Sequence, residues 1–140
     1  MTAFWRTWLT VWCIGVGVFG LVLAGAAFPA TDGAVRLLFQ VLNGPGDTVL
    51  DAHMRFSVGL MGAVTLGWSI TLHGLIQAAL RWEPQGGPAW RNLLVGMAVW
   101  YLVDGVISVA TGFWLNAVSN TVISVALLVP LIRTGVLSRA

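Results

Sequence analysis

The chain has little charge and no lysine. Charged residues make up 9% of its 140 residues and hydrophobic residues 58%, whereas soluble domains have about 25% charged and about 45–50% apolar residues. So few charged side chains cannot give a soluble globule a hydrated surface. Together with a mean hydropathy of +0.88, this composition predicts an integral membrane protein.

All seven basic residues are arginines, and the net charge is only +2. No run of basic residues alternates with aromatic ones, as it does in many proteins that bind DNA or RNA. We therefore expect no nucleic-acid partner.

Cysteine is almost absent, which excludes several kinds of chemistry. Cys13 is the only one, so an intramolecular disulfide, a CxxC redox pair and a cysteine-based zinc site are excluded. It lies in an apolar run, where a thiol is expected to pack as a small hydrophobic group. The chain also lacks a P-loop, an HExxH motif and any nucleophile–base pair, so the sequence predicts no catalytic residue and no metal site.

Four apolar segments are long enough to cross a bilayer, which takes about 20 residues of helix. The sequence therefore predicts one all-α domain over residues 1–140, an integral membrane four-helix bundle. Ala24-Gly25-Ala26 resembles a signal-peptidase site, but the run before it holds no charge and is long enough to span, so we expect a retained helix. The predicted spans are residues 8–28, 54–80, 90–110 and 113–132.

The connector 29–48 separates the first two spans. Within it, residues 34–42 form an apolar stretch with Arg36 and Gln40 on one face. This stretch is too short to span, and it suits either a helix lying in the interface plane or an ordinary loop helix.

The segment 48–81 predicts a long central helix. Thr48 and Asp51 match a capping box, with Asp47 as a competing cap. Gly59, Ala63 and Gly67 recur every fourth residue, and such small residues let neighbouring helices approach closely. In the first span, three glycines form a second expected packing face: Gly15, Gly17 and Gly20.

Aromatic and proline residues add two expectations. Trp5, Trp8 and Trp12 lie at helical spacing near the start of the first span, as an interfacial aromatic anchor would. Pro130 is expected to distort the last turn of the fourth span without preventing it from crossing.

The arginines predict the orientation in the membrane. Five lie on one side of the spans, against Arg36 and Arg55 on the other, and cytoplasmic loops carry the excess of positive charge. In a bacterial inner membrane, both termini would then be cytoplasmic and the connector periplasmic. The five are Arg6, Arg81, Arg91, Arg133 and Arg139.

Asp104 is the most informative polar residue, because it lies inside the third span. A charged group at the centre of a helix costs about 2.5–3.5 kcal/mol on insertion scales, so we expect a polar partner or a protonated side chain. Two polar faces of helical period support a partner. Folding the chain about residue 112 places three pairs opposite one another: Asp104 with Asn120, Ser108 with Asn116, and Trp100 with Ser124.

This polar seam has two interpretations. Interhelical hydrogen bonds could simply join the last two helices, at about 0.6 kcal/mol each. Alternatively, the seam could bind a proton, an ion or a small-molecule head group. Arg55 is a possible counter-ion for Asp104, although Asp51, four residues earlier, competes for it.

The two histidines cannot act together in one subunit. His53 and His73 are 20 residues apart, about 30 Å along one helix, so they cannot be the two axial ligands of a haem. His73 is the candidate for function because it lies deeper in the membrane. We expect it to bond to a neighbouring helix or to reach the interface.

The layout resembles the small four-helix bacterial inner-membrane proteins described as DoxX-like. The resemblance covers an N-terminal span, a periplasmic connector and the opening of the second span, Arg55-Phe56-Ser57-Val58-Gly59. Some of those proteins are described as accessory subunits of quinol oxidase. The resemblance implies no particular functional residue here.

Three functions remain open from the sequence. The first is a non-catalytic accessory or scaffold subunit of a membrane complex or homo-oligomer. The second is a small carrier or binder of a lipophilic or weakly ionic ligand, which uses the Asp104 seam. The third is an accessory role that involves quinone or haem.

Overall fold

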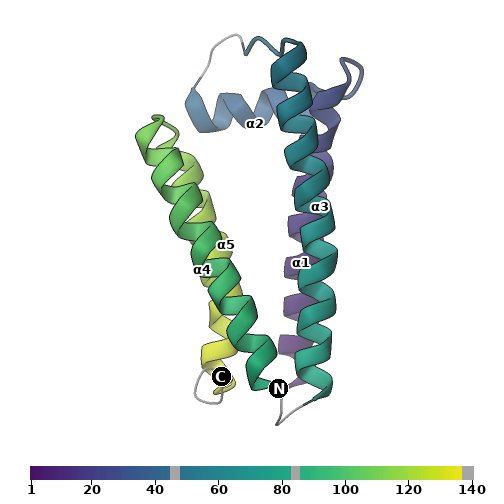
Figure 1. Ribbon diagram of the computed structural model, residues 1–140, viewed down its shortest axis with the longest axis vertical. Coiled ribbons are helices and arrows are strands. Elements are labelled where there is room, and N and C mark those ends of the chain that lie inside the picture. Colours follow the sequence, from purple (N-terminus) through teal and green to yellow (C-terminus); the bar gives the residue numbers. More distant parts are fainter. Residues whose placement is uncertain (45–47, 83–85, 137–140) are drawn as a thin grey trace. The chain divides into compact units, whose positions relative to one another are not determined.

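The chain is almost entirely helical. A computed structural model describes residues 1–44, 48–82 and 86–136 (Figure 1). These residues contain no β-strand, which confirms the all-α prediction. The elements in chain order are α1 (Ala3–Ala24), the 3₁₀ turn η1 (Gly25–Ala27), α2 (Gly33–Asn43), α3 (Ala52–Arg81), α4 (Gly87–Ala110) and α5 (Trp114–Arg133).

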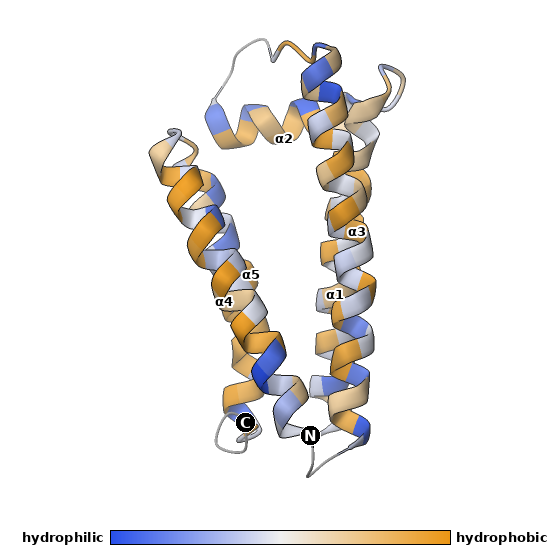
Figure 2. Cartoon of the chain, in the orientation of Figure 1, coloured by the Kyte–Doolittle hydropathy of each residue, from blue (hydrophilic) through white to orange (hydrophobic). Residues whose placement is uncertain are grey.

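Four of these helical segments are long and apolar enough to cross a membrane. They are Ala3–Ala27, Ala52–Arg81, Gly87–Ala110 and Trp114–Arg133. Apolar residues run along each of them (Figure 2). Many point outward, as Phe56 and Val106 do, each with 69% of its surface exposed. Such surfaces suit contact with lipid rather than with water.

The helices lie near the predicted spans, with the largest difference at α1, which begins at Ala3 where residue 8 was predicted. The predicted start signal of α3 is also different. Asp51 is the residue that caps this helix, because its Oδ1 accepts a hydrogen bond from the Met54 N–H (2.8 Å). The capping box that begins at Thr48 is therefore wrong by three residues, and the competing cap Asp47 lies outside the described residues. The 30 residues of α3 span about 45 Å, which exceeds the ~30 Å hydrocarbon core.

The chain divides into two compact units. Residues 14–70 form the first, here called the connector unit, and residues 1–13 with 71–140 form the second, the hairpin unit. The connector unit contains the second half of α1, all of η1 and α2, and α3 up to residue 70. The hairpin unit contains α4, α5 and the remaining parts of α1 and α3.

In the connector unit, α2 lies across the direction of α1 and α3 (Figure 1). Its Val35 is fully buried against Leu23, Ala26 and Val58. On its other side, Leu37 is 62% exposed. A short helix that crosses the spans and has apolar residues on an outer face suits the interface plane, which is one of the two alternatives that the sequence leaves open.

The helices α1 and α3 approach each other most closely at Gly20 and Gly62. A Cβ atom on Gly20 would lie 2.7 Å from the Leu66 amide nitrogen and 3.0 Å from the Gly62 carbonyl oxygen. A Cβ atom on Gly62 would collide with the backbone of Ala24. Only glycine fits at these two positions.

The predicted small-residue faces are therefore only partly right. Gly17 and Gly20 pack against α3, and Gly59 packs against Ala27, whereas Cβ atoms at Gly15 and Gly67 would meet nothing within 4 Å. The stripe of every fourth residue on α3 misses Gly62, which makes the tightest contact. A helical turn takes 3.6 residues, so residues spaced four apart do not stay on the same face of α3.

The hairpin unit is built around the reversal between α4 and α5. Gly112 has a φ of +87°, which is left-handed and favours glycine. The Phe113 N–H donates to the Ser108 carbonyl (2.8 Å) and the Gly112 N–H to the Val109 carbonyl (3.2 Å). These two bonds form a Schellman motif, which ends α4 and returns the chain antiparallel, as folding about residue 112 predicts.

Two tryptophans of α1 bond to the backbone of α5. Trp8 Nε1 donates to the Ala126 carbonyl (2.8 Å), and Trp12 Nε1 donates to the Ile123 carbonyl (2.9 Å). Pro130 lies inside α5 and has no N–H to offer Ala126, four residues earlier. The Trp8 indole thus satisfies a carbonyl that Pro130 leaves without its helical donor. These two N–H groups therefore join α1 to α5, a contact that sequence analysis did not predict.

Candidate functional site

Asp104 lies at the centre of a hydrogen-bond cluster between α4 and α5. Its Oδ1 accepts from the Ser108 hydroxyl (2.9 Å), from Asn116 Nδ2 (2.8 Å) and from Asn120 Nδ2 (2.6 Å). Asn116 Nδ2 also donates to the Ser108 hydroxyl oxygen (2.9 Å). The register that the sequence predicts for these four residues is therefore confirmed.

The hydrogen bonds of this cluster use most of its donor groups and leave several acceptor oxygens without a bond. Asn116 and Asn120 turn their nitrogens toward Oδ1, because two facing oxygens would repel each other. Their own amide oxygens and Asp104 Oδ2 accept no hydrogen bond from the described residues. Among those residues, Ser124 Oγ is the only fully buried side-chain N or O atom without a partner. The three acceptor oxygens therefore keep accessible surface.

Two further contacts extend the seam. Tyr101 Oη lies 3.0 Å from Thr121 Oγ1, and Thr121 Oγ1 donates its proton to the Ala117 carbonyl (2.8 Å). The Tyr101 hydroxyl must therefore be the donor to Thr121. Sequence analysis did not identify Thr121, although it follows Asn120 directly and Tyr101 lies three residues before Asp104 on the same helical face.

The third predicted pair does not form a hydrogen bond. Ser124 Oγ is buried and has no partner among the residues that the structure describes, so Trp100 does not bond to it. Trp100 itself is half-buried on α4. Trp114, at the start of α5, is 59% exposed.

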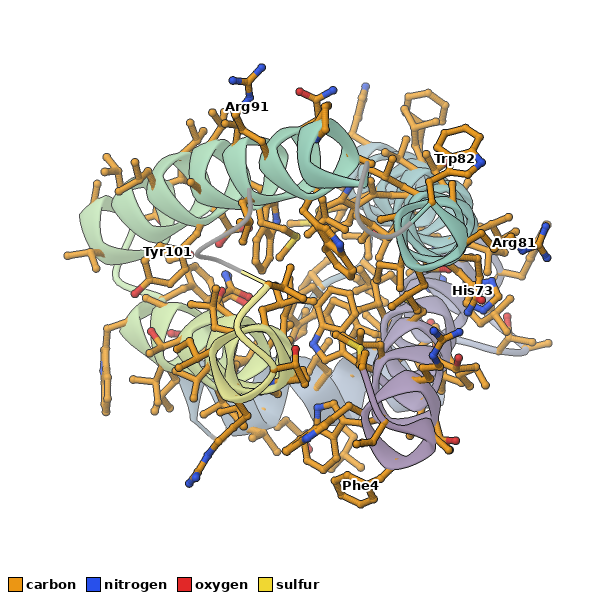
Figure 3. All side chains as sticks on the ribbon, turned by 90° about the horizontal axis from the view of Figure 1, so that it is seen from below. Phe4, His73, Arg81, Trp82, Arg91 and Tyr101 are labelled. Carbon is orange, nitrogen blue, oxygen red and sulfur yellow. The ribbon has the colours of Figure 1, made fainter. Side chains whose placement is uncertain are left out.

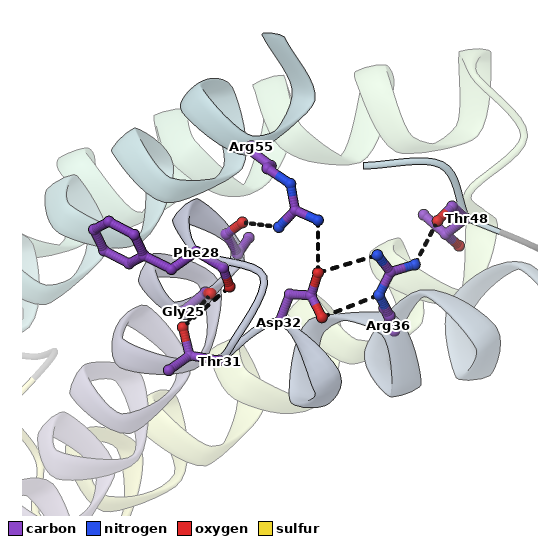
Figure 4. Close-up of polar contacts among 8 residues, drawn as sticks. Gly25, Phe28, Thr31, Asp32, Arg36, Thr48 and Arg55 are labelled. Atoms are coloured by element: carbon purple, nitrogen blue, oxygen red, sulfur yellow. Dashed lines mark hydrogen bonds and ion pairs between the residues drawn. The ribbon is translucent and has the colours of Figure 1, made fainter. Parts of the chain in front are cut away.

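A second polar cluster lies in the connector unit, around Asp32 between the first two spans (Figure 4). Asp32 Oδ2 accepts from Arg55 (2.8 Å) and from Arg36 (3.0 Å), while Asp32 Oδ1 accepts from Arg36 Nε (3.0 Å). Arg55 also donates to the Ala26 carbonyl (3.1 Å), and Arg36 to the Thr48 carbonyl (2.9 Å). One buried carboxylate thus ties together the end of α1, the start of α2 and the start of α3.

Sequence analysis did not identify Asp32 as a residue of interest. The spacing of Asp32 and Arg36 at i and i+4 could have predicted their ion pair. The ion pair of Arg55 with Asp32 is a long-range contact that no local pattern predicts. Arg55 therefore has its counter-ion in the connector unit, and the described residues give Asp104 only neutral donors. The Arg55–Asp104 pair, which the sequence left as one possibility, is not observed.

The arginines shift the titration of Asp32. Hydrogen bonds from Arg36 and then from Arg55 lower the pKa of Asp32 below its usual value. Because the folded-state pKa lies below the unfolded one, the stabilisation is complete above the ordinary Asp pKa of about 3.9 and is lost as the pH falls below it.

We therefore expect Asp32→Asn to lower the thermal stability at neutral pH, because two arginines, one with a side chain only 18% exposed, lose their counter-ion. The difference in melting temperature between wild type and Asp32→Asn should shrink as the pH falls from 5 to 2. Melting curves in lipid nanodiscs across this range measure it. A difference that stays constant down to the lowest pH would contradict the assignment.

Neither histidine forms a hydrogen bond to a residue of the two clusters. His53 is exposed, as expected for an interfacial residue. His73 Nε2 lies 3.3 Å from Gln77 Nε2, one turn later on the same helix, so its partner is not on a neighbouring helix. Figure 3 shows Arg81 and Arg91 extending away from the helices. Among the described residues, no three His, Cys, Asp or Glu side chains gather as metal ligands.

Comparison with known proteins does not extend this description. No family model, curated protein or solved structure matches the chain. The class of the protein therefore follows from its own helices, whose length and apolar surfaces define a multi-pass α-helical membrane protein.

Proposed function

We propose that the protein is a small membrane carrier or binding protein in which Asp104 binds a lipophilic or weakly ionic ligand. The observation that carries this proposal is the uneven use of the Asp104 carboxylate. Oδ1 accepts three hydrogen bonds, and Oδ2 accepts none from the described residues. Oδ1 therefore fixes the side chain, and Oδ2 is left for a partner from outside.

The position of the cluster supports binding from within the bilayer. Asp104 is eight residues before the turn at Gly112, about 12 Å along the helix. Intramembrane ionisable residues commonly mark substrate or ion pathways because they are costly to keep there. A seam that served only to join two helices would not need a carboxylate, since asparagine and serine already bond across helices.

Asp104→Asn tests this proposal. The substitution keeps the size of the side chain and an acceptor oxygen for the cluster, but it removes the charge. When Asp104→Asn is purified in mild detergent, the amount of the copurifying small molecule should be at least tenfold lower than in wild type. Mass spectrometry of organic extracts measures this amount.

Asp51→Asn is the matched control, because it makes the same chemical change at an exposed helix cap and asparagine caps as well as aspartate. It should retain the wild-type level. Equal amounts of copurified molecule in wild type and Asp104→Asn, with both proteins folded, would reject the binding role.

An accessory or scaffold subunit is the second candidate. Its support is an exposed face of small residues on α3, formed by Gly67, Thr71 and Gly74, because such residues let another helix approach closely. The resemblance to DoxX-like proteins points the same way. Native mass spectrometry in gentle detergent should then show a homo-oligomer or a larger complex, and a lone monomer would count against it.

We also propose an orientation in the membrane and a test for a bound cofactor. We place both termini in the cytoplasm of a bacterial inner membrane, because four of the described arginines lie at one set of helix ends; Arg139 lies outside the described residues. A role with quinone or haem would give the purified protein an absorbance spectrum beyond that of its tryptophans.

A further inference from the structure

We infer that the ligand of the Asp104 cluster carries a protonated primary or secondary amine on an apolar body. This inference rests on the proposed binding function and names the chemical class of the ligand. Three observations carry it: the charge of the cluster, its remaining acceptors and the apolar surface beside it.

The first observation is that the carboxylate has no cation beside it on either helix of the hairpin. Its three donors are a hydroxyl and two amides, all neutral. Arg91 on α4 is 13 residues before Asp104, and Arg133 on α5 is 13 residues after Asn120, about 20 Å in each case. A carboxylate in a low-dielectric site without a counter-ion is costly, so a cationic ligand would be bound in compensation.

The second observation is that the polar groups left over are mainly acceptors. Both N–H groups of Asn116 are already used, on Asp104 and on Ser108. What remains is Asp104 Oδ2, the two amide oxygens and one N–H of Asn120. A complementary ligand must donate several hydrogen bonds, as an ammonium group does. A divalent metal ion suits the cluster less well, because it prefers more oxygen ligands and more than one carboxylate.

The third observation concerns the surface around the cluster. On α4, Val103 is 55% exposed and Ile107 is 57% exposed, and they lie directly before Asp104 and three residues after it. In a bilayer these side chains face hydrocarbon. A ligand that reaches Asp104 along this surface needs an apolar body, which favours a lipophilic amine over a small hydrophilic one.

Four probes that differ only in the head group test the inference on the wild-type protein. In phosphatidylcholine nanodiscs, octylamine should bind saturably at neutral pH in calorimetric titrations corrected with empty nanodiscs. Octyltrimethylammonium keeps the charge but has no N–H, and octanol keeps a donor but has no charge, so each should bind at least tenfold more weakly. Nonanoate, which carries the same octyl chain on a carboxylate, should not bind.

The site of binding can be read independently of any variant. Octylamine should shift the side-chain amide NMR signals of Asn116 and Asn120, and it should leave the signal of Gln77 unchanged. Asp104→Asn should weaken octylamine binding at least tenfold, and Asn120→Ala, which keeps the carboxylate, should weaken it by a smaller factor. If Asp104→Asn does not fold, the effect of Asn120→Ala still tests whether octylamine binds at this cluster.

The outcomes separate the ligand class from the proposed function. If octyltrimethylammonium or octanol binds as tightly as octylamine, the inference on the amine is overturned while Asp104 can still be a binding residue. If no probe binds but an Asp104-dependent molecule copurifies, the class is wrong and the function holds. If octylamine binding and the amount of the copurified molecule are both unchanged in Asp104→Asn, and the amide signals do not move, both are rejected.

Discussion

Gly62→Ala should destabilise the protein, although alanine is the better helix former. At this position even a Cβ atom collides with the backbone of Ala24, and backbone cannot move aside as a flexible side chain can. Overpacking of this kind costs about 1–3 kcal/mol, and sometimes more. Unfolding in mixed micelles with increasing sodium dodecyl sulfate measures the loss.

Gly96→Ala is the matched control, since a Cβ atom on Gly96 would meet nothing within 4 Å. There the substitution should be neutral or stabilise the helix by up to about 1 kcal/mol, from helix propensity alone. The two variants thus carry the same chemical change and are expected to shift stability in opposite directions. A Gly62→Ala protein as stable as wild type would show that α1 and α3 do not cross at this glycine pair.

Trp8→Phe should also destabilise the protein, and Pro130→Ala should restore part of the loss. Phenylalanine removes the indole N–H from the Ala126 carbonyl, and a backbone carbonyl that has no donor within a membrane span costs several kcal/mol. Alanine at position 130 supplies the helical N–H that proline lacks. In a double-mutant cycle, the coupling between the two substitutions should be about 1 kcal/mol or more.

Trp12→Phe serves as the control for this cycle. The Ile123 carbonyl accepts the Trp12 indole, but the residue four positions later is Leu127, which has its own N–H. Trp12→Phe should therefore cost less than Trp8→Phe, and Pro130→Ala should not rescue it. Equal rescue of both variants would mean that Pro130→Ala acts through general helix stability and not through the Ala126 carbonyl.

The contacts that hold the helices together differ from those of the candidate site. The Gly20–Gly62 approach and the Asp32 ion pairs fix the connector unit, while the indole bonds of Trp8 and Trp12 hold α1 against α5 in the hairpin unit. Two members of the Asp104 cluster, Asn116 and Asn120, lie on α5, and Ala126 follows Asn120 by six residues on the same helix. A ligand at Asp104 therefore binds to helices that other interactions already hold in place.

The sequence alone determined which segments of this protein form membrane-spanning helices. Apolar runs of about 20 residues without charge predict spans, because an unbroken helix satisfies its own backbone groups in lipid. The sequence also predicted the Asp104 register, because the turn at Gly112 is short and the polar residues on both sides share a helical period. In an antiparallel hairpin, these two facts fix which residues face one another.

Only the tertiary structure decided which distant residues meet. Arg55 pairs with Asp32, not with Asp104, and Gly62, not Gly67, makes the close approach to α1. The indole of Trp8 bonds to the carbonyl that Pro130 leaves without a donor. Each of these contacts depends on the rotation and crossing of helices that are far apart in the chain. Membrane helices are apolar on most sides, so the hydrophobic pattern does not specify which face of one helix meets which face of another.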